Sequence, residues 1–507
     1  MGRAWSSRSA RRLSAWGLLA VLAVATQGRA YQLSADFDTG SLDVGGSTIV
    51  GDVITLAGRD NFNPGDWKWL HFRLDDAGGQ RPAFQIDDDF ANGGSNLNDH
   101  EMVYSYDGQS WEFFDYNQRS SAQGRYAFYN DGPFTSDTVF VAYGLPYTVG
   151  RAEQLVSGLA SSPWVRPTAS GDASFAIGAS PGGVDDLGRS IPSHPIRAFG
   201  LSDPDGAAER VSVVLASGVH ANEGLGNLVL EGLVDYLAGD SLQAGLLRKV
   251  ADFAVYPLIN PDGRYAGMNR STVARPADDP NRFWSSPGYG GHAELQVVGD
   301  AMLADTGAEA DYVIDFHSTV VGKSGHFAYV HPAMQGDPLW QSLLALEPAI
   351  DTRNASLIDD TLAKFGRDEL GAGFSITFET QFIAGENEDR FLGIGQSFAL
   401  AMFQTLFTLG DLNLDGVFDR DDWLLQIAHA ETELAAFSAA DAYLRGDLDG
   451  DGANGIADFA LFKSLYEQAH GPGAFARMLA VPEPSAAILS SLALMRIATL
   501  SRRHPRC

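Results

Sequence analysis

Between residues 31 and 165 the apolar positions gather in short runs that Gly, Asp and Asn interrupt, and no long helical period appears. Short apolar runs bounded by turn residues are typical of β-strands. The predicted strands are Ser47–Leu56, Trp67–Leu74, Ala83–Ile86, Met102–Tyr106, Arg125–Tyr129 and Thr138–Tyr143. Strands of this length, separated by turn chemistry, predict a β-sandwich for this part of the chain.

From residue 166 to 409 the pattern changes, and apolar strands alternate with helical stretches. In Leu225–Leu237, for example, apolar side chains recur at the spacing of a helix. A second helix is predicted at Phe391–Phe407, and the predicted strands are Val211–Val219, Phe253–Ile259, Tyr312–Phe316 and Ser375–Phe378. Strands that are apolar on both faces and alternate with helices indicate an α/β unit.

Two aspartate-rich loops follow between residues 410 and 470. The first contains Asp411, Asn413, Asp415, Asp419 and Asp422, and the second contains Asp447, Asp449, Asp451 and Asp458. Alternating oxygen side chains, with a glycine at the sharp turn, enclose a single Ca²⁺ ion. Each loop leads into an apolar helix, predicted at Trp423–Ile427 and Phe459–Tyr466. The tandem loops resemble a type I dockerin, which implies a small α-helical calcium-binding unit and a cohesin-like partner.

Size and composition restrict the class of protein. A chain of 507 residues is too long for one ordinary domain, and a hydrophobic content of 45% excludes a disordered protein. The formal net charge of −29 argues against a nucleic-acid partner, because few cations are present to neutralise phosphates. An acidic extracellular protein and acidic calcium sites both account for this charge.

Both termini have the pattern of addressing segments. Residues 1–30 combine basic residues, the apolar stretch Leu13–Ala25 and the small-residue site Gly28-Arg29-Ala30, as export signals do. The only cysteine is Cys507, so no internal disulfide can form in an exported chain. At residues 481–507, Val481-Pro482-Glu483-Pro484-Ser485 precedes an apolar stretch and two arginines. This end resembles a PEP-CTERM sorting signal, which implies anchoring at the cell envelope; a short amphipathic helix is the alternative.

Candidate chemistry lies at the ends of the predicted strands, where the ligands of α/β sheets gather. His220 and Glu223 follow the first strand of the unit, and His317 follows the third. Two imidazole nitrogens and a carboxylate form a ligand set of hydrolytic zinc sites. Either Asp315 or Asp279 can accept the far imidazole N–H of a ligand and fix its tautomer. The alternative for His317 is a buried, hydrogen-bonded side chain without a metal.

A hydrolytic zinc site also needs a base. Glu379 ends an otherwise apolar strand, where burying a carboxylate without a role is costly, so it is the predicted general base. Arg270 is predicted to stabilise a developing oxyanion. Asn281 and Arg282 suit a bidentate grip on a substrate carboxylate. Solvent-exposed surface charges are the alternative for the two arginines.

In combination, these residues resemble the zinc metallocarboxypeptidase family. The motifs are His220-x-x-Glu223, Asn260-Pro261-Asp262-Gly263, Arg270, Asp279-x-Asn281-Arg282-x-Trp284, His317 and Glu379. Val139–Thr148 resembles the end of the β-sandwich that precedes the catalytic domain in cytosolic carboxypeptidase-like (deglutamylase-type) members. The resemblance implies a mixed β-sheet flanked by helices, zinc, and hydrolysis at the C-termini of peptides or proteins. Two departures are Pro280, in place of Leu or Ala, and the lack of a tyrosine between Tyr329 and Glu379.

Substrate preference and two other functions stay open. Lys364 and Arg367 precede Glu379, about where such enzymes form the side-chain pocket, and a cation there would favour C-terminal Glu or Asp. Exposed helix charges are the alternative. An aspartoacylase-type amidohydrolase would share the scaffold and ligands, although the predicted β-sandwich argues against it. A calcium-dependent scaffold or binding protein with an inactive hydrolase domain is the other possibility.

Overall fold

The computed structural model of the chain describes residues 31–59, 61–62, 69–87, 101–120, 125–319, 325–356, 359–383 and 385–480. The predicted export signal and the predicted sorting segment lie outside these residues. Within the described part, no helix combines the length and apolar character needed to cross a membrane.

The N-terminal unit consists of two five-stranded sheets, ordered β1-β4-β10-β6-β7 and β2-β3-β5-β9-β8. The strands are β1 (Gln32–Ser34), β2 (Asp43–Val50), β3 (Val53–Ala57), β4 (His71–Asp75), β5 (Ala83–Asp87), β6 (Val103–Ser105), β7 (Glu112–Phe113), β8 (Tyr116–Ser120), β9 (Arg125–Tyr129) and β10 (Val139–Ala142). Phe72 of β4, Val141 of β10 and Phe84 of β5 belong to one buried cluster, so the two sheets share a core. This arrangement is the β-sandwich that the short apolar runs predict.

Two local predictions in this region were wrong. The predicted strand Ser47–Leu56 is the hairpin of β2 and β3, because Gly51 turns the chain with a φ of 63°. A helix, α2 (Val149–Leu159), also lies in this region, where the sequence pattern predicts only strands. Its buried face is narrow, with only three buried residues, and these pack into the core of the following unit.

The α/β unit is built on an eight-stranded mixed sheet ordered β11-β16-β18-β17-β19-β22-β20-β21. The strands are β11 (Val165–Pro167), β16 (Phe199–Leu201), β17 (Val211–Ser217), β18 (Ala251–Tyr256), β19 (Tyr312–Thr319), β20 (Phe327–Val330), β21 (Asp351–Asn354) and β22 (Phe374–Gln381). The four central strands β18, β17, β19 and β22 are parallel. Their carboxyl ends therefore meet at one edge, which is where the predicted site residues lie.

Helices cover both faces of this sheet. Val213 and Leu215 of β17 pack in the cluster that includes α3 (Gly224–Ala238) and α9 (Glu388–Leu406). Val214 and Ala216 face the opposite cluster, which includes α6 (Ala293–Thr306) and α8 (Leu362–Asp368). This alternation is the period of a strand buried on both sides. The other helices of the unit are α4 (Leu242–Val250), α5 (Pro261–Tyr265) and α7 (Pro338–Leu346).

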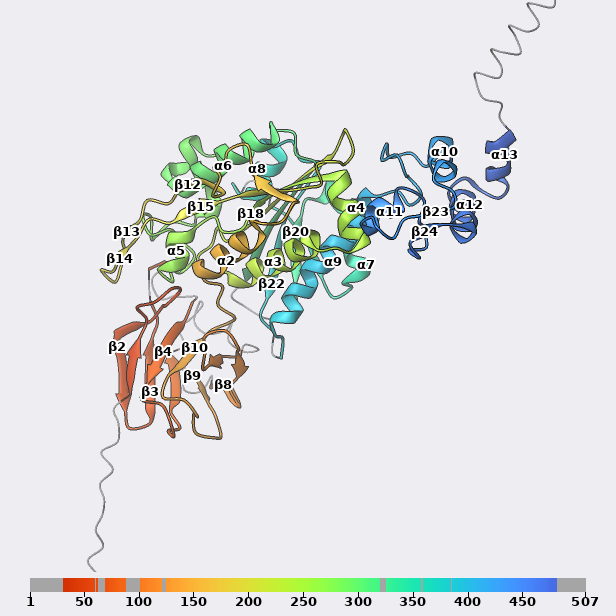
Figure 1. Ribbon diagram of the computed structural model, residues 1–507. Coiled ribbons are helices and arrows are strands. Elements are labelled where there is room, and N and C mark those ends of the chain that lie inside the picture. Colours follow the sequence, from red (N-terminus) through yellow and green to blue (C-terminus); the bar gives the residue numbers. More distant parts are fainter. Residues whose placement is uncertain are drawn as a thin grey trace, which may run out of the picture.

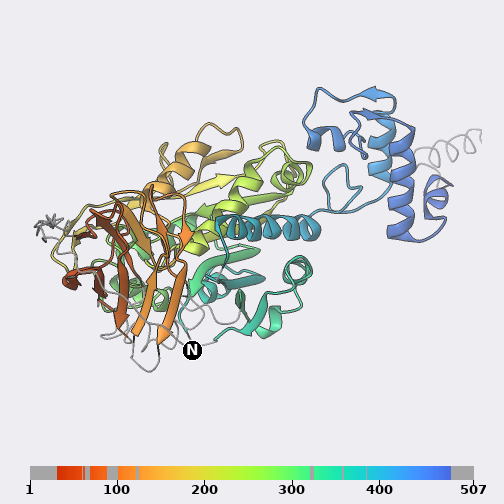
Figure 2. The same ribbon diagram turned by 90° about the horizontal axis from the view of Figure 1, so that it is seen from below.

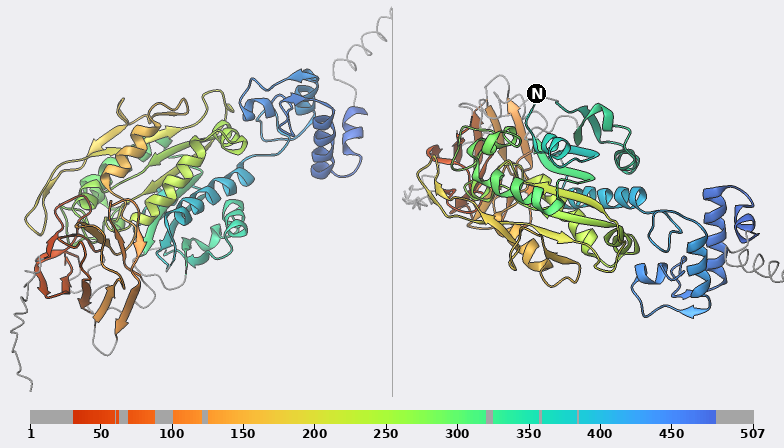
Figure 3. Two further views of the ribbon diagram at one scale, coloured as in Figure 1. Left: turned by 60° about the horizontal axis from the view of Figure 1, so that its bottom comes forward. Right: turned by 90° about the horizontal axis from the view of Figure 1, so that it is seen from above.

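A third, mainly helical unit follows α9. It contains α10 (Arg420–Ala428), β23 (Thr432–Glu433), α11 (Ala439–Tyr443), β24 (Ala453–Asn454), α12 (Ile456–His470) and α13 (Ala474–Ala480). The sandwich and this unit lie at opposite ends of the α/β unit (Figure 1). Figures 2 and 3 show α9 running towards the C-terminal unit. Leu246 of α4 is buried in the same cluster as Tyr443 of α11, so the last two units share a core.

Candidate metal centre and active site

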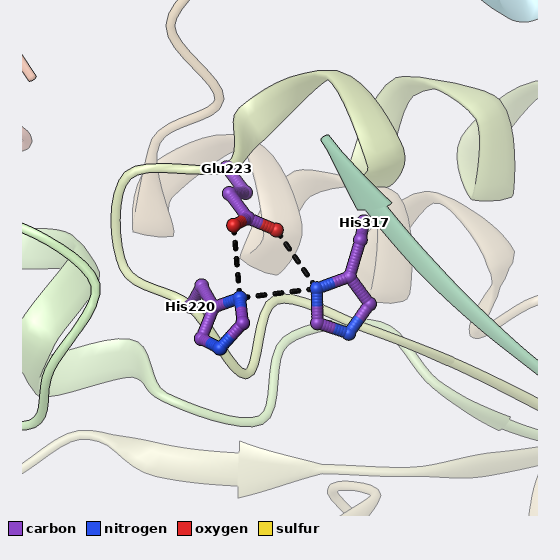
Figure 4. A group of neighbouring side chains, drawn as sticks. All are labelled: His220, Glu223 and His317. Atoms are coloured by element: carbon purple, nitrogen blue, oxygen red, sulfur yellow. Dashed lines mark hydrogen bonds and ion pairs between the residues drawn. The ribbon is translucent and has the colours of Figure 1, made fainter. Parts of the chain in front are cut away.

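Three buried side chains converge beyond the carboxyl ends of β17 and β19. His220 and Glu223 lie in the loop between β17 and α3, and His317 lies on β19 (Figure 4). Nδ1 of His220 lies 2.9 Å from one oxygen of Glu223, and Nδ1 of His317 lies 2.8 Å from the other. The two Nδ1 atoms are 3.1 Å apart. Acceptor lone pairs gathered so closely inside a protein need a cation to balance them, and zinc fits this donor set.

A carboxylate contacts the far side of each imidazole. Nε2 of His220 lies 2.9 Å from Oδ1 of Asp279, and Nε2 of His317 lies 2.7 Å from Oδ2 of Asp315. The sequence left open which aspartate plays this part, and the structure places one on each ring. A carboxylate that accepts the Nε2–H fixes the tautomer and leaves the lone pair of Nδ1 facing the proposed ion.

We call the loop between β17 and α3, which carries His220 and Glu223, the metal loop. Its backbone is held by residues to which the sequence assigns no such role. Arg264 is fully buried and donates to the carbonyls of His220 (3.3 Å) and Glu223 (3.1 Å). Burial lowers the pKa of this guanidinium to about 10. Asn260 donates to the carbonyls of Val219 (3.2 Å) and Ser271 (3.0 Å), which adjoin His220 and Arg270. The Asn-Pro-Asp-Gly motif therefore has a structural role, because its Asn260 fixes the backbone beside His220 and Arg270.

Glu379 lies on β22 directly opposite His317 of β19 in the parallel pair. It is buried, and its Oε2 has no hydrogen-bond partner among the described residues. Burial and the nearby Glu223 carboxylate raise its pKa to about 8. A divalent cation at the neighbouring ligands would act in the opposite direction. The carboxyl group thus has an acceptor that is free to take a proton at the metal centre.

Arg270 lies over the same carboxylates. Its Nη1 donates to Glu223 Oε1 at 3.1 Å, and its Nε donates to Asp279 Oδ2 at 3.0 Å. Its backbone has a φ of 63°, in the left-handed region that a non-glycine residue rarely adopts. The guanidinium is therefore fixed beside the ligand cluster, where negative charge would develop during hydrolysis.

A cavity of about 440 Å³ opens above these groups. It is lined by Glu379, Arg270, Arg282 and Asn281, together with residues of β20, β21 and α8. Arg282 is 42% exposed and can reach a ligand. Asn281 is buried, and its Oδ1 already accepts the backbone N–H of Leu362 at 2.9 Å. Pro280 occupies the first position of a short 3₁₀ turn, which tolerates proline without distortion.

Lys364 and Arg367 of α8 also line this cavity. Both contact Asp368, with Lys364 Nζ at 2.6 Å and Arg367 Nε at 3.0 Å from its oxygens. Their side chains are 24% and 18% exposed. They are thus neither fully solvated helix charges nor unpaired cations, and the shared carboxylate offsets part of their charge.

The two aspartate-rich loops adopt nearly the same hydrogen-bond pattern. Asp411 accepts N–H groups from Leu414 and Gly416, as Asp447 does from Gly450 and Gly452. The buried Asp422 and Asp458 each accept two N–H groups from the residues nine and ten positions earlier. Each also accepts a third N–H from the residue that precedes α10 or α12. Oxygens of Asp447, Asp449 and Asp451 lie within 4.8 Å of one another.

The first loop differs in its side chains. Asn413 donates its Nδ2–H to Asp415 at 2.9 Å, so an amide oxygen replaces a carboxylate there. Asp419 caps α10 by accepting the backbone N–H of Asp421 at 2.8 Å. Burial raises the pKa of Asp422 to about 6. Seven of the nine predicted ligand residues lie in the two loops, and Asp422 and Asp458 lie in the first turns of α10 and α12.

Comparisons with known proteins point to one family. Residues 183–297 match the family model for zinc carboxypeptidase. Cytosolic carboxypeptidase 6 of Homo sapiens is 27% identical over 195 residues, which cover 37% of this chain and 38% of that protein. Cytosolic carboxypeptidase 3 of Mus musculus is 30% identical over 156 residues, which cover 30% of this chain and 14% of that protein. The matched segment is thus well under half of either relative.

Solved structures give the same fold. A metallo-carboxypeptidase from Burkholderia cenocepacia superposes with a TM-score of 0.61 and 22% identity, covering 74% of this chain and 98% of that one. A metallo-carboxypeptidase from Pseudomonas aeruginosa, in complex with (2-guanidinoethylmercapto)succinic acid, has a TM-score of 0.57 and 20% identity over 74% and 98% of the two chains. The chain thus contains a segment, residues 183–297, that matches the zinc carboxypeptidase family, and it has the fold of solved metallo-carboxypeptidases.

Proposed function

We propose that this protein is an exported zinc metallocarboxypeptidase that hydrolyses the C-terminal peptide or isopeptide bond of peptides and proteins. The observation that carries the proposal is the position of Glu379. It is buried directly opposite His317 and lines the same cavity as His220, Glu223 and Arg270. Two candidate ligands, a base and a cation thus face one cavity, as hydrolysis requires.

The chain's own residues divide the chemistry between them. Zinc held by His220, Glu223 and His317 would supply a Lewis acid for the scissile carbonyl and lower the pKa of water. Glu379 takes the proton of the attacking water and delivers it to the leaving amine. Arg270 donates hydrogen bonds to the developing oxyanion. Arg282 pairs with the terminal carboxylate of the substrate.

The cavity favours an acidic C-terminal residue. Arg282, Lys364 and Arg367 line it, and Asp359 is the only carboxylate among its described lining residues besides Glu223 and Glu379. Asp368 offsets part of the charge of Lys364 and Arg367 but does not itself line the cavity. A substrate glutamate or aspartate side chain would therefore enter a space with a cationic wall.

A library of peptides with all C-terminal residues, followed by mass spectrometry, tests this function. We expect loss of single C-terminal residues, fastest for Glu and Asp and slowest for Lys and Arg. Cleavage of N-acyl amino acids alone would favour the amidohydrolase. A zinc-loaded protein that cleaves neither class would favour the binding protein. Equal rates for acidic and basic C-termini would contradict the cationic pocket while leaving the peptidase assignment intact.

Export and calcium binding complete the proposal. The basic and apolar pattern of residues 1–30 supports export, and the pattern of residues 481–507 supports anchoring at the cell envelope. The paired loops support binding of two Ca²⁺ ions by the C-terminal unit, with a cohesin-like protein as its partner. Calcium suits an extracellular protein without internal disulfides, because bound cations stabilise the folded state.

Calcium titration into the purified, calcium-free protein should show two sites by calorimetry and a rise in melting temperature. At about 100 times the Kd, each site is expected to add about 2.7 kcal/mol to the free energy of unfolding. Asp458→Asn should reduce the stoichiometry to one, because it removes the carboxylate that closes the second loop. Asp421→Asn, the same change at an exposed position of the unit, should leave it at two. Two sites in Asp458→Asn would contradict the assignment.

A further inference from the structure

We infer that the β-sandwich supports the active site. Its residues Arg59 and Asn61 clamp the segment 266–271 through hydrogen bonds and so position Arg270. This inference rests on the oxyanion role proposed for Arg270. Neither residue touches the cavity or the ligand cluster. Both are therefore positioning residues, separated from the segment they hold by more than two hundred positions of sequence.

Asn61 brackets Arg270 from both sides. Its Oδ1 accepts the backbone N–H of Asn269 at 2.8 Å. Its Nδ2 lies 3.2 Å from the carbonyl of Asn269 and 2.8 Å from Oγ of Ser271. The same amide nitrogen lies 3.3 Å from the carbonyl of Pro276. One side chain of the sandwich thus fixes the residue before Arg270 and the residue after it.

Arg59 holds the start of the same segment. Its side chain is completely buried and donates to the carbonyl of Ala266, while its own carbonyl accepts from Nδ2 of Asn269. Asp185 lies 3.0 Å from the guanidinium and balances its charge. An arginine that is fully buried and paired in this way is costly to displace, so the contact is rigid. Figure 1 shows α5, which precedes the segment, on the side of the α/β unit that faces the sandwich.

The opposite side of the segment is tied to the metal loop. The N–H of Arg270 donates to Oδ1 of Asn222 at 2.9 Å, and its carbonyl accepts from the N–H of Ala221 at 3.2 Å. Both partners are neighbours of the ligands His220 and Glu223. The segment therefore lies between the sandwich on one side and the metal loop on the other.

The left-handed backbone of Arg270 explains why such a clamp is needed. A non-glycine residue with a φ of 63° is strained by about 1–2 kcal/mol. Strain of this kind persists only where surrounding contacts over-determine the conformation. When the contacts of Asn61 are removed, the backbone can relax to negative φ, which would swing the guanidinium away from Glu223 and Asp279.

A double-mutant cycle tests the inference with zinc-loaded full-length protein. Asn61→Ala is expected to lower kcat by about 10- to 100-fold, as small displacements of a catalytic group do, with KM changed less than about threefold. Arg270→Gln alone should lower kcat by about 100-fold or more. Because Asn61 acts through Arg270, Asn61→Ala should cost less than about threefold more in the Arg270→Gln background.

Asn117→Ala is the matched control. This sandwich amide is also held by several hydrogen bonds, including those from Met102 N and Tyr126 Oη at 2.8 Å, but none reaches the segment. It should lower the melting temperature without changing kcat. If Asn61→Ala does not fold, Asn61→Asp replaces it in the cycle, since it keeps the acceptor for Asn269 and removes the donor.

The outcomes separate this inference from the proposed function. Full activity in Arg270→Gln would refute the oxyanion role. A slow Arg270→Gln together with a normal Asn61 variant would refute the clamp. An equal loss from Asn61→Ala in both backgrounds would also overturn it, because the sandwich would then act on the site by a route other than Arg270.

Discussion

Glu379→Gln should lower kcat by about 10²- to 10⁴-fold, the usual contribution of a positioned general base. Glutamine keeps the shape of the side chain but cannot accept a proton from water. The zinc ligands His220, Glu223 and His317 are unaltered, so zinc content should stay the same. Peptide hydrolysis followed by mass spectrometry, with zinc measured on the same samples, checks both expectations.

The matched control for this variant is Asp359→Asn. Asp359 lines the same cavity, and no hydrogen bond to its side chain occurs within the described residues. The same acid-to-amide change there should leave kcat within about threefold. Comparable losses in both variants would mean that the charge of the cavity, and not a base at position 379, controls the rate.

The pH profile gives a second readout. Glu379 acts as a base only when ionised, so kcat/KM of the unchanged protein should fall as pH drops through the pKa of this carboxyl group. The Gln variant should lose this acidic limb, because no proton binds at position 379. An acidic limb that persists unchanged in the variant would assign the titration to another group.

The fold and the positions of the candidate site residues could be predicted because their signals are local. The apolar run before His220 is β17, the run before Glu379 is β22, and the helical period at Leu225–Leu237 is α3. Parallel strands place their carboxyl ends at one edge, so residues far apart in sequence could be brought together by topology alone. The structure places His220, Glu223, His317 and Glu379 at that edge.

What sequence reasoning missed depends on long-range contacts that leave no periodic pattern. In the sequence, Arg264 is one charged residue among many. In the structure, its buried guanidinium donates to the carbonyls of His220 and Glu223. The sequence pattern predicts only a loop at Asn61, yet its side chain accepts a hydrogen bond from Asn269, 208 positions away. The helix α2 buries only three small or branched side chains, too few for a clear amphipathic period. Such roles follow from packing between units.

The C-terminal unit gives a further example. The spacing of its acidic residues predicts the tandem loops. No sequence pattern, however, indicates that Lys249 of α4 is buried between Asp203 and Asp441. The pair with Asp441, at 3.0 Å, joins the α/β unit to α11, and Asp203, at 2.7 Å, holds the ammonium group from within the α/β unit. The shared cluster around Leu246 and Tyr443 adds apolar contact. The C-terminal unit is therefore packed on the α/β unit through α4.

The second large effect is expected at the metal ligands. His220→Ala should lower zinc affinity by more than about 100-fold, because it removes one of three donors to the ion. Asp279→Asn should cost about 10- to 100-fold, the usual effect of losing the carboxylate that orients a ligating histidine. Asp315→Asn should behave like Asp279→Asn, since each aspartate contacts one ligand ring. Competition with a chromophoric chelator measures all three affinities.

A histidine outside the cluster provides the control for this series. His194 also pairs with a buried carboxylate, Asp262, at 2.7 Å, but it contacts none of the ligands. His194→Ala should therefore keep zinc affinity within about threefold of the unchanged protein. The graded order, with His220 above the two aspartates and the aspartates above His194, is what coordination by this cluster requires. Zinc bound equally well by His220→Ala would place the ion elsewhere, and the base at Glu379 would then have no metal centre to serve.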